Sequence, residues 1–185
     1  MDKGFENKTD EELVNLSLED QSAYLMLMKR YEGKLLSYIK RISGFAIEDA
    51  QDVLQDVFLS VYLNLRKFNN EYKFSSWIYR ITHNKTISFY RKYKKRLVVA
   101  EVDNNAFVEL LTGITDEEDK LTQEVLASKV KEEIQNMDVK YKAVLVLRYL
   151  ENKEYNEISD ILKIPVSNVG VLINRAKKIL KDKLN

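Results

Sequence analysis

The scarcity of helix-breaking residues is the feature that most constrains the fold of this chain. Its 185 residues include only 5 Gly and 1 Pro, although 45% of them are hydrophobic. Glycine and proline interrupt α-helices and supply most tight turns, so a chain this poor in both favours helices throughout. The length suffices for one ordinary domain or two small ones with apolar cores. We therefore predict an all-α protein.

The spacing of apolar residues indicates where the helices lie. The most regular stripe recurs at steps of one, three and four residues, as one face of an α-helix requires, and it comprises Val53, Leu54, Val57, Phe58, Val61, Tyr62 and Leu65. Thr9 followed by Glu12 has the capping-box pattern and predicts a short helix that ends near Ser17. Other helices are expected at about 20–42, from Trp77 onward with Ser75 or Ser76 as N-cap, and near 121–136, 138–150, 154–162 and 166–183.

One stretch lacks this periodicity. Residues 97 to about 120 are acidic and show no sustained apolar spacing. A structureless stretch of that length is uncommon inside a compact domain, so we interpret it as a linker. The predicted architecture is two small helical domains, residues 1–96 and 121–185, joined by a flexible acidic linker over residues 97–120.

Charge is strongly segregated along the chain, although the net charge is only +1. Residues 78–96 contain seven basic and no acidic residues, and residues 163–185 contain six basic residues against one acidic residue. Residues 97–128, between them, carry eight acidic residues against one Lys. Lysines that merely solvate a helix explain one such basic cluster, but two clusters favour two contact sites on one nucleic acid.

Composition argues against several classes of protein. The chain has no Cys and a single His, His83, so cysteine-zinc sites, iron–sulfur clusters, thiol catalysis and histidine triads are not expected. No glycine-rich phosphate loop is present either, and we predict no catalytic residue, no metal site and no cofactor. Residues 1–10 are polar and acidic, and no run approaches eighteen apolar residues. We expect a cytoplasmic protein without direct membrane insertion.

The segment from Tyr155 to Ile173 has the pattern of a helix-turn-helix. Ile158 and Ile161 would form the inner face of the first helix, Ile164-Pro165 the turn, and Val169 the inner face of the second. A plain helical hairpin gives a similar apolar pattern. DNA binding is favoured because the second helix would turn polar and basic residues outward.

Two parts of the chain together resemble a known family. Residues 49–62, followed by residues 74–84, look like the second conserved region of bacterial sigma factors, and residues 141–151 with the helix-turn-helix look like their fourth region. The layout, with only a linker between the halves, is similar to extracytoplasmic-function (ECF, group IV) sigma factors, and the resemblance covers about residues 20–183. It implies a factor that binds core RNA polymerase, directs it to promoters and catalyses no reaction itself.

The resemblance implies a polymerase-binding helix. The helix from Asp52 to Leu65 looks like the segment that docks on the coiled-coil clamp helices of the polymerase β′ subunit. The implied docking residues are Asp52, Gln55, Asp56, Leu59 and Leu65. From the residues alone, without this resemblance, an acidic face that is merely solvated is the first interpretation.

A second implied site reads the promoter −10 element. The run from Arg80 to Asn84 resembles the Arg-Ile-Ala-x-Asn sequence that begins the family's −10 reading helix. The resemblance implies that Asn84 and the loop of residues 69–75 hold a base flipped out of the non-template strand, for which an amide offers both a donor and an acceptor. The implied set is Phe74, Arg80, His83, Asn84, Lys85, Arg91, Lys92 and Lys95, with His83 expected on the helix surface near the DNA.

The helix-turn-helix would read the −35 element. Its implied contact residues are Tyr155, Ser167, Asn168, Gly170, Val171, Asn174, Arg175 and Lys178. Many relatives carry basic or hydroxyl residues where this chain has Gly170, Val171 and Leu172, so base contacts are expected mainly from the polar members of the set. Lys163 occupies a turn position where relatives often have Gly.

The resemblance implies three partners. They are core RNA polymerase, through its β′ clamp helices and β flap, promoter DNA, and an anti-sigma factor.

Two alternatives to the sigma-factor function remain open. A helix-turn-helix transcriptional regulator that acts without core polymerase predicts tight binding to duplex DNA, usually as a dimer. A helical protein-interaction adaptor predicts no salt-dependent affinity for DNA. A further hypothesis is that the acidic linker folds back on the basic helices and suppresses DNA binding.

Overall fold

The computed structural model describes residues 4–93, 133–134 and 136–184. Every regular element in these ranges is helical, which confirms the all-α prediction. The N-terminal group consists of α1 (Asp10–Leu16), α2 (Gln21–Ser43), α3 (Ile47–Asn64), the short 3₁₀ turn η1 (Leu65–Lys67) and α4 (Phe74–Tyr93). The C-terminal group consists of α7 (Val139–Leu145), the π-helical turn η2 (Val146–Leu150), α8 (Tyr155–Leu162) and α9 (Val166–Leu184). The predicted linker, residues 97–120, lies outside the described residues.

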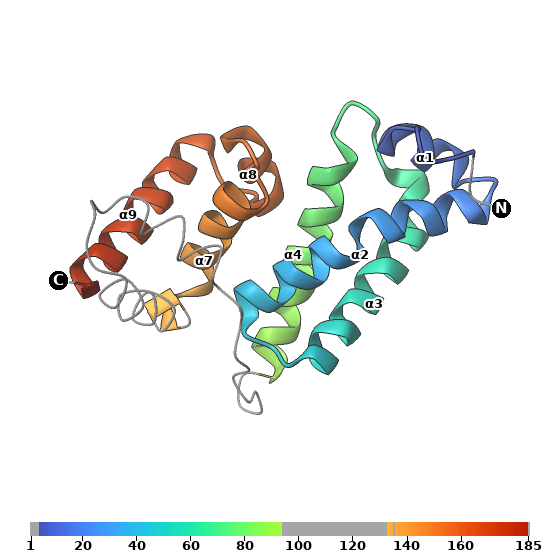
Figure 1. Cartoon of the computed structure of the whole chain (residues 1–185). Coiled ribbons are helices and arrows are strands. Elements are labelled where there is room, and N and C mark those ends of the chain that lie inside the picture. Colours follow the sequence, from blue (N-terminus) through green and yellow to red (C-terminus); the bar gives the residue numbers. More distant parts are fainter. Residues whose placement is uncertain (1–3, 94–132, 135, 185) are drawn as a thin grey trace, which may run out of the picture.

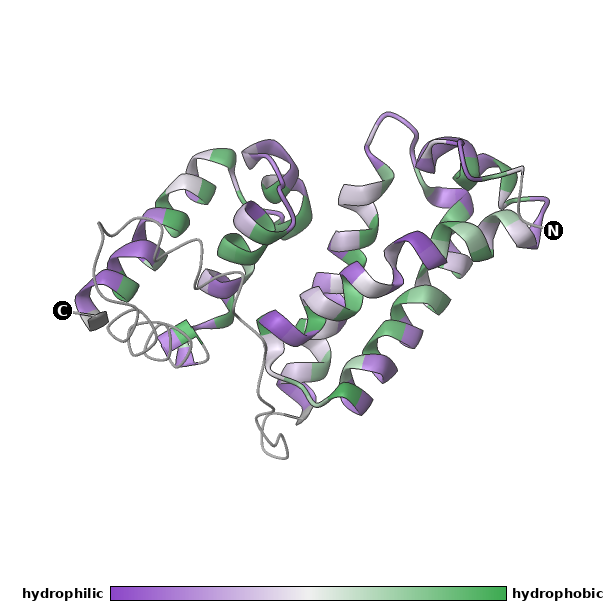
Figure 2. Cartoon of the chain, in the orientation of Figure 1, coloured by the Kyte–Doolittle hydropathy of each residue, from purple (hydrophilic) through white to green (hydrophobic). Residues whose placement is uncertain are grey.

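The N-terminal group is a bundle in which α2, α3 and α4 pack on one another and α1 closes one end (Figure 1). Its interior is built from the apolar stripes of these helices, with Leu35, Ile39, Val57 and Ile78 fully buried. The apolar positions of each helix face its neighbours, while the polar positions face outward (Figure 2). Burial of such side chains stabilises the bundle by about 1.5–3 kcal/mol each.

Local capping signals set most helix ends. The predicted capping box is present: the Thr9 amide donates to the Glu12 carboxylate at 2.7 Å, and the Glu12 amide donates to the Thr9 hydroxyl at 3.2 Å. Gly44 ends α2 in the left-handed conformation, with φ of 73°, which glycine adopts without strain.

The start of α4 differs from the prediction. The helix begins at Phe74, so Ser75 and Ser76 lie inside its first turn and neither is the N-cap. The Phe74 amide instead donates to the Glu11 carboxylate of α1 at 3.0 Å. A cap supplied by another helix leaves no local pattern in the sequence, which explains the error.

The C-terminal group contains the helix-turn-helix. Helices α8 and α9 meet through Ile158, Ile161, Val169 and Ile173, all of which are buried. Lys163 ends α8 with a φ of 55°, the left-handed conformation that explains why glycine suits this turn position.

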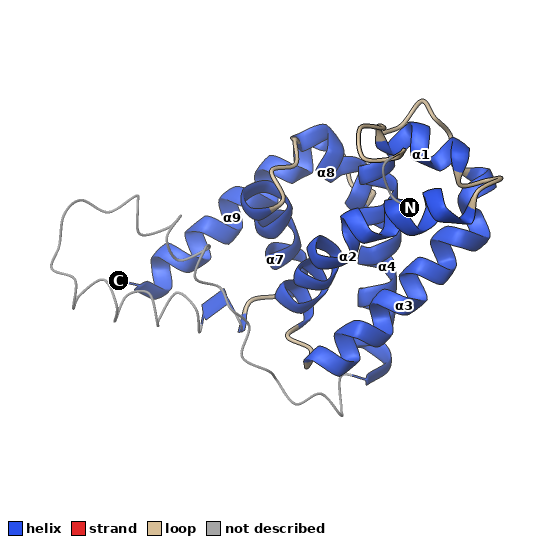
Figure 3. Ribbon diagram, turned by 45° about the vertical axis from the view of Figure 1, so that its right-hand side comes forward, coloured by secondary structure: helices blue, strands red, loops and turns tan. Residues whose placement is uncertain are grey.

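The two groups pack against each other. The strongest contacts join α8 to α4, and weaker ones join α7 and η2 to α2. Figure 1 and the turned view of Figure 3 both show α8 beside α4. This arrangement places the first helix of the helix-turn-helix against the N-terminal domain.

Candidate nucleic-acid and protein interfaces

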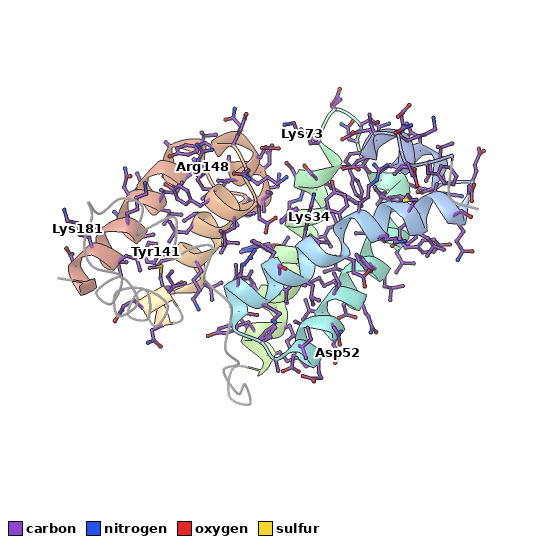
Figure 4. All side chains as sticks on the ribbon, viewed as in Figure 1. Lys34, Asp52, Lys73, Tyr141, Arg148 and Lys181 are labelled. Atoms are coloured by element: carbon purple, nitrogen blue, oxygen red, sulfur yellow. The ribbon has the colours of Figure 1, made fainter. Side chains whose placement is uncertain are left out.

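The first candidate surface is the outer face of α3. Asp52, Gln55, Asp56 and Leu59 are all exposed along one side of this helix, opposite the buried valines of the stripe. Figure 4 shows Asp52 on α3, on the side of the bundle away from α8. Leu59 is 58% exposed, and such a mixture of carboxylates and large apolar side chains on one face is typical of a protein-docking surface.

Two residues near the end of α3 correct the expected docking set. Leu65 is only 4% exposed and packs into the core from η1, so it belongs to the interior rather than to the docking face. Leu63 was not singled out from the sequence, yet it is 67% exposed beside exposed Tyr62. Leu63 lies outside the regular apolar spacing of α3, and this was the sign in the sequence that its side chain would be exposed.

The second candidate surface runs along α4. Trp77, Arg80 and Asn84 follow one another at steps of three and four residues and therefore share one face of the helix. Asn84 is exposed, whereas Arg80 and Trp77 are partly buried. Arg91 and Lys92 are exposed two turns further along, and Lys95 lies outside the described residues. The face thus presents an amide, a guanidinium and further cations in a row.

The loop before α4 is organised by Asn69. The Asn69 side-chain oxygen accepts from the Glu71 amide at 3.0 Å, and the Tyr72 amide donates to the Asn69 carbonyl at 3.1 Å. This turn leaves Tyr72 57% exposed. Together with the first turns of α4, the loop lines one wall of a groove of about 410 Å³ whose other wall is α8. An exposed aromatic ring beside cationic side chains suits stacking on an unpaired base.

Phe74 does not belong to this surface. Its ring is fully buried and makes edge contacts with the rings of Tyr31 and Phe68, each at 5.6 Å between centroids. It anchors the start of α4, and it cannot reach DNA.

His83 is also placed differently from the expectation. It is partly buried, and its Nδ1 atom lies 2.9 Å from the Tyr38 hydroxyl. Burial lowers the pKa of His83 to about 4, so the ring is neutral at neutral pH. Because the ring is turned toward Tyr38 on α2, we remove His83 from the DNA-binding set.

The third candidate surface is the outer face of α9. The exposed members of the predicted set are Ser167, Asn168, Val171, Asn174, Arg175 and Lys178. Donors, acceptors and an apolar side chain on one exposed helix match what the DNA major groove presents.

Gly170 lies against Tyr155 and is not on the exposed face. It is partly buried, and a Cβ atom added there would lie 3.5 Å from the Tyr155 ring. Tyr155 itself is 40% exposed, and the Arg148 guanidinium lies over its ring at 5.4 Å. Position 170 therefore lies at the α8–α9 contact, where an alanine would also fit beside this tyrosine.

Sequence reasoning missed a polar cluster between the domains. Glu151, directly after η2, has a side chain only 8% exposed, accepts a hydrogen bond from the Tyr79 hydroxyl and lies 3.7 Å from an Arg41 guanidinium nitrogen. Burial, followed by the charge of Glu151, raises the pKa of Tyr79, so the phenol stays protonated and donates. No local pattern identifies this cluster, because its members come from α2, from α4 and from the residue that follows η2.

Some features are absent from the described ranges. No helix among residues 4–93 and 136–184 has the length and apolar character needed to cross a membrane. The described residues also hold no group of three or more side chains suited to bind a metal ion.

Comparisons with known proteins agree with the helical two-domain fold. The family model Sigma-70 region 2 matches residues 27–96, and the model Sigma-70, region 4 matches residues 128–180. The solved structure of CnrH in complex with the cytosolic domain of CnrY has a TM-score of 0.66 at 24% identity, covering 95% of this chain and 96% of the other. The sigma factor RpoE in complex with the anti-sigma factor NepR from Bartonella quintana has a TM-score of 0.58 at 16% identity, covering 89% and 95%. These structures share the fold.

Two relatives are similar over nearly the whole chain. The ECF RNA polymerase sigma factor SigW of Bacillus subtilis is 31% identical over 170 residues, which cover 89% of this chain and 90% of SigW. The ECF RNA polymerase sigma-E factor of Escherichia coli K12 is 29% identical over 187 residues, which cover 97% and 96% of the two chains. This chain therefore belongs to the family of ECF RNA polymerase sigma factors.

Proposed function

We propose that this chain docks on core RNA polymerase through the outer face of α3 and reads promoter DNA through α4 and α9. The observation that carries the proposal is that the three exposed polar faces lie on the helices where the family resemblance expects polymerase, −10 and −35 contacts. We assign the protein to the cytoplasm, where its polymerase and promoters are found. Nucleotide addition belongs to the polymerase, and we assign no reaction to this chain.

The α3 face is suited to a helical, basic partner. Asp52 and Asp56 are one turn apart and both exposed, and Leu59 continues the same face. The carboxylates would pair with cations at the rim of such an interface, while Leu59 would be buried at its centre. We assign this face to the clamp helices of the β′ subunit.

The α4 surface is suited to single-stranded DNA. Exposed Asn84 offers the donor and acceptor that a flipped base requires, and exposed Tyr72 offers a stacking face. Arg80, Lys85 and Arg91 would neutralise phosphates along the strand. This division assigns capture of the melted −10 element to α4 and the loop before it.

The α9 surface is suited to duplex DNA in the major groove. Asn174 and Arg175 are exposed beside Val171, so hydrogen bonds to base edges and apolar contact with thymine methyl groups are both available. We assign this face to the −35 element.

An anti-sigma protein is a further proposed partner. Two structural neighbours were solved in complex with other proteins: CnrH with the cytosolic domain of CnrY, and the sigma factor RpoE with the anti-sigma factor NepR. The large exposed side chains Leu59 and Leu63 of this chain would suit burial by such a protein when polymerase is absent.

Run-off transcription tests the proposal. Purified core polymerase and genomic promoter fragments are combined with and without this protein, and discrete factor-dependent transcripts are expected. Absence of transcripts, together with absence of core binding in a pull-down, would contradict the proposal. Tight binding to duplex DNA without polymerase would then favour a helix-turn-helix regulator. Absence of any salt-dependent affinity for DNA would favour a protein-interaction adaptor.

A further inference from the structure

We propose that α1 belongs to the −10 reading site: Glu11 and Asn15 are positioning residues that hold the two ends of the loop before α4 and thereby shape it for base capture. This role rests on the proposed function, which assigns α4 and its preceding loop to the melted −10 element. It gives a part in promoter selectivity to a helix outside the contact set expected from the sequence.

The loop before α4 has no buried side chain of its own. Residues 69–73 are all exposed, whereas Phe74, which follows them, is fully buried. Inside the loop, the Glu71 and Tyr72 amides donate to Asn69 and form a local turn. A local turn does not fix where a loop lies relative to the rest of the protein. The position of this loop therefore depends on its bonds to other elements.

Helix α1 supplies such bonds at both ends of the loop. The Phe74 amide donates to the Glu11 carboxylate at 3.0 Å, and the Asn70 side chain donates to the Asn15 side-chain oxygen at 3.1 Å. Glu11 and Asn15 are four residues apart in α1 and therefore lie on one face of the helix. Figure 1 and Figure 3 both show α1 beside the loop. One face of α1 thus holds two points of the loop at once.

Arg30 and Tyr31 of α2 fix the start of α1. The Arg30 guanidinium donates to the Asp10 carboxylate at 3.1 Å and to three backbone carbonyl groups of residues 5–8 at distances between 2.7 and 3.0 Å. The Tyr31 hydroxyl donates to the same carboxylate, and the Tyr31 ring packs edge-on against the Phe74 ring. Hydrogen bonds that involve charged groups are the stronger class. α1 is therefore a firm support for the loop.

A loop held in this way favours base recognition in particular. Exposed Tyr72 lies between Asn70 and Phe74, the two residues that α1 holds. Stacking and base-edge contacts depend on orientation, and a loop that is ordered beforehand loses less entropy on binding. Contacts of Arg80 and Arg91 with phosphates carry no sequence information. Loss of the α1 bonds should therefore reduce selectivity for the promoter and leave phosphate binding intact.

The experiment measures selectivity with holoenzyme, which is core polymerase bound to the full-length factor. The promoter is one identified by run-off transcription with the wild-type chain. Two labelled single-stranded oligonucleotides are compared: the non-template strand of that promoter, and the same strand with its −10 element randomised. Selectivity is the dissociation constant of the randomised strand divided by that of the promoter strand. This ratio reports base recognition, because phosphate contacts are common to both strands.

Asn15→Ala is the first variant. Asn15 is exposed, so the fold and the affinity for core polymerase should be unchanged. Binding of the promoter strand should weaken by about three- to tenfold, as the loss of one hydrogen bond predicts, with no change for the randomised strand. Equal weakening of both strands would indicate a general structural role and overturn the proposal, and so would an unaltered ratio.

Asn70→Ala tests whether Asn15 acts through the loop. In a chain that already carries Asn70→Ala, the bond to Asn15 is absent, so adding Asn15→Ala should have no further effect on selectivity. An undiminished effect of Asn15→Ala in that background would contradict positioning through Asn70.

Glu11→Ala should also lower the selectivity ratio, and Glu11→Gln should restore it, because the side-chain oxygen of glutamine can accept the same bond from the Phe74 amide. Glu19→Ala removes an exposed carboxylate just after α1 and is the charge-matched control, with no change expected. Failure of Glu11→Gln to restore the ratio would rule out the hydrogen-bonding role of Glu11. Where Glu11→Ala fails to fold, Asn15→Ala still decides the proposal.

The proposed function and the role of α1 fail in different ways. Absence of factor-dependent transcripts with the wild-type chain would refute the proposed function and this role with it. Normal transcripts from the wild type, with an unaltered selectivity ratio for Asn15→Ala, would refute the role of α1 alone.

Discussion

The Tyr79 hydroxyl of α4 donates a hydrogen bond to the Glu151 carboxylate, which lies 72 positions later in the chain. Both side chains are buried, and the bond joins the N-terminal bundle to the helix-turn-helix domain. A residue of the proposed −10 reading helix is thereby committed to a partner within the protein.

Tyr79→Phe tests the energetic weight of this bond. The change leaves the buried Glu151 carboxylate with one donor fewer, so we expect a loss of about 1.5–3 kcal/mol in the free energy of unfolding. Urea denaturation followed by circular dichroism measures it. Tyr72→Phe, at an exposed tyrosine, is the control and should be neutral. Equal stability of the wild type and Tyr79→Phe would contradict the expected contribution.

Asn84→Ala tests base capture by α4. The change removes an exposed amide that packs into no core, so stability and affinity for core polymerase should be unchanged. Open-complex formation should fall by about tenfold, the effect of losing roughly 1–3 kcal/mol of base contact. Permanganate footprinting of promoter DNA reports the melting. Ser88→Ala, one turn further along α4 and also exposed, is the matched control. Parallel loss of core binding would indicate a different role for Asn84.

Asp52→Lys combined with Asp56→Lys tests the docking face of α3. Reversing two exposed charges should weaken core polymerase binding by about tenfold or more, with greater loss at low salt. Fluorescence anisotropy with labelled factor measures the affinity. Glu32→Lys on α2 introduces a similar exposed charge reversal outside this face and should have little effect. If both variants bind equally well, polymerase docks elsewhere.

Because the His83 ring is buried, we expect the protein to lose stability in mild acid. Burial lowers its folded pKa to about 4, while the unfolded ring keeps its ordinary value of about 6.5, so on acidification the unfolded state takes up the proton first. The stability contribution is complete above the unfolded value and falls with pH between the two values, by up to about 1.4 kcal/mol per pH unit. Asp138, Lys140 and Arg91 line the same groove as the ring. The free energy of unfolding, measured from denaturation curves at each pH, should depend less on pH in this range for His83→Gln than for the wild type. An identical pH dependence of the two proteins would contradict the assignment.

Gly170→Ala separates helix packing from DNA contact. The added Cβ would meet the Tyr155 ring at 3.5 Å, an ordinary van der Waals separation. Alanine has a higher helix propensity than glycine, so we expect a gain of about 0.5–1 kcal/mol in stability. Thermal denaturation measures the gain, and duplex binding should be unaffected. Asn174→Ala, on the exposed face of α9, should weaken duplex binding and leave the thermal stability unchanged.

Local patterns in the sequence predicted much of the fold. The Thr9 capping box, the stripe from Val53 to Val61 and the turn at Lys163 are each specified within a few residues, and the structure has all three. The same periodicity predicted that Asp52 and Asp56 face outward, because it defines which side of a helix is apolar. The all-α architecture and the helix-turn-helix therefore follow from the sequence by itself.

The misplaced residues depend on contacts that are distant in sequence. Phe74 is buried because Tyr31 and Phe68 surround it, and α4 begins there because Glu11 caps it. His83 turns inward toward Tyr38. A polar or aromatic residue carries no local record of which distant element will cover it, so its exposure cannot be predicted from spacing alone.

The sequence by itself determined the helices, their apolar faces and the segregation of charge, because each is a property of neighbouring residues. Only the tertiary structure decided that Glu151 lies between Arg41 and Tyr79, and that the acidic side of α8 faces the cations around the start of α4. Those contacts arise from the packing of two domains. Their energies depend on burial and distance between side chains that sequence order does not specify.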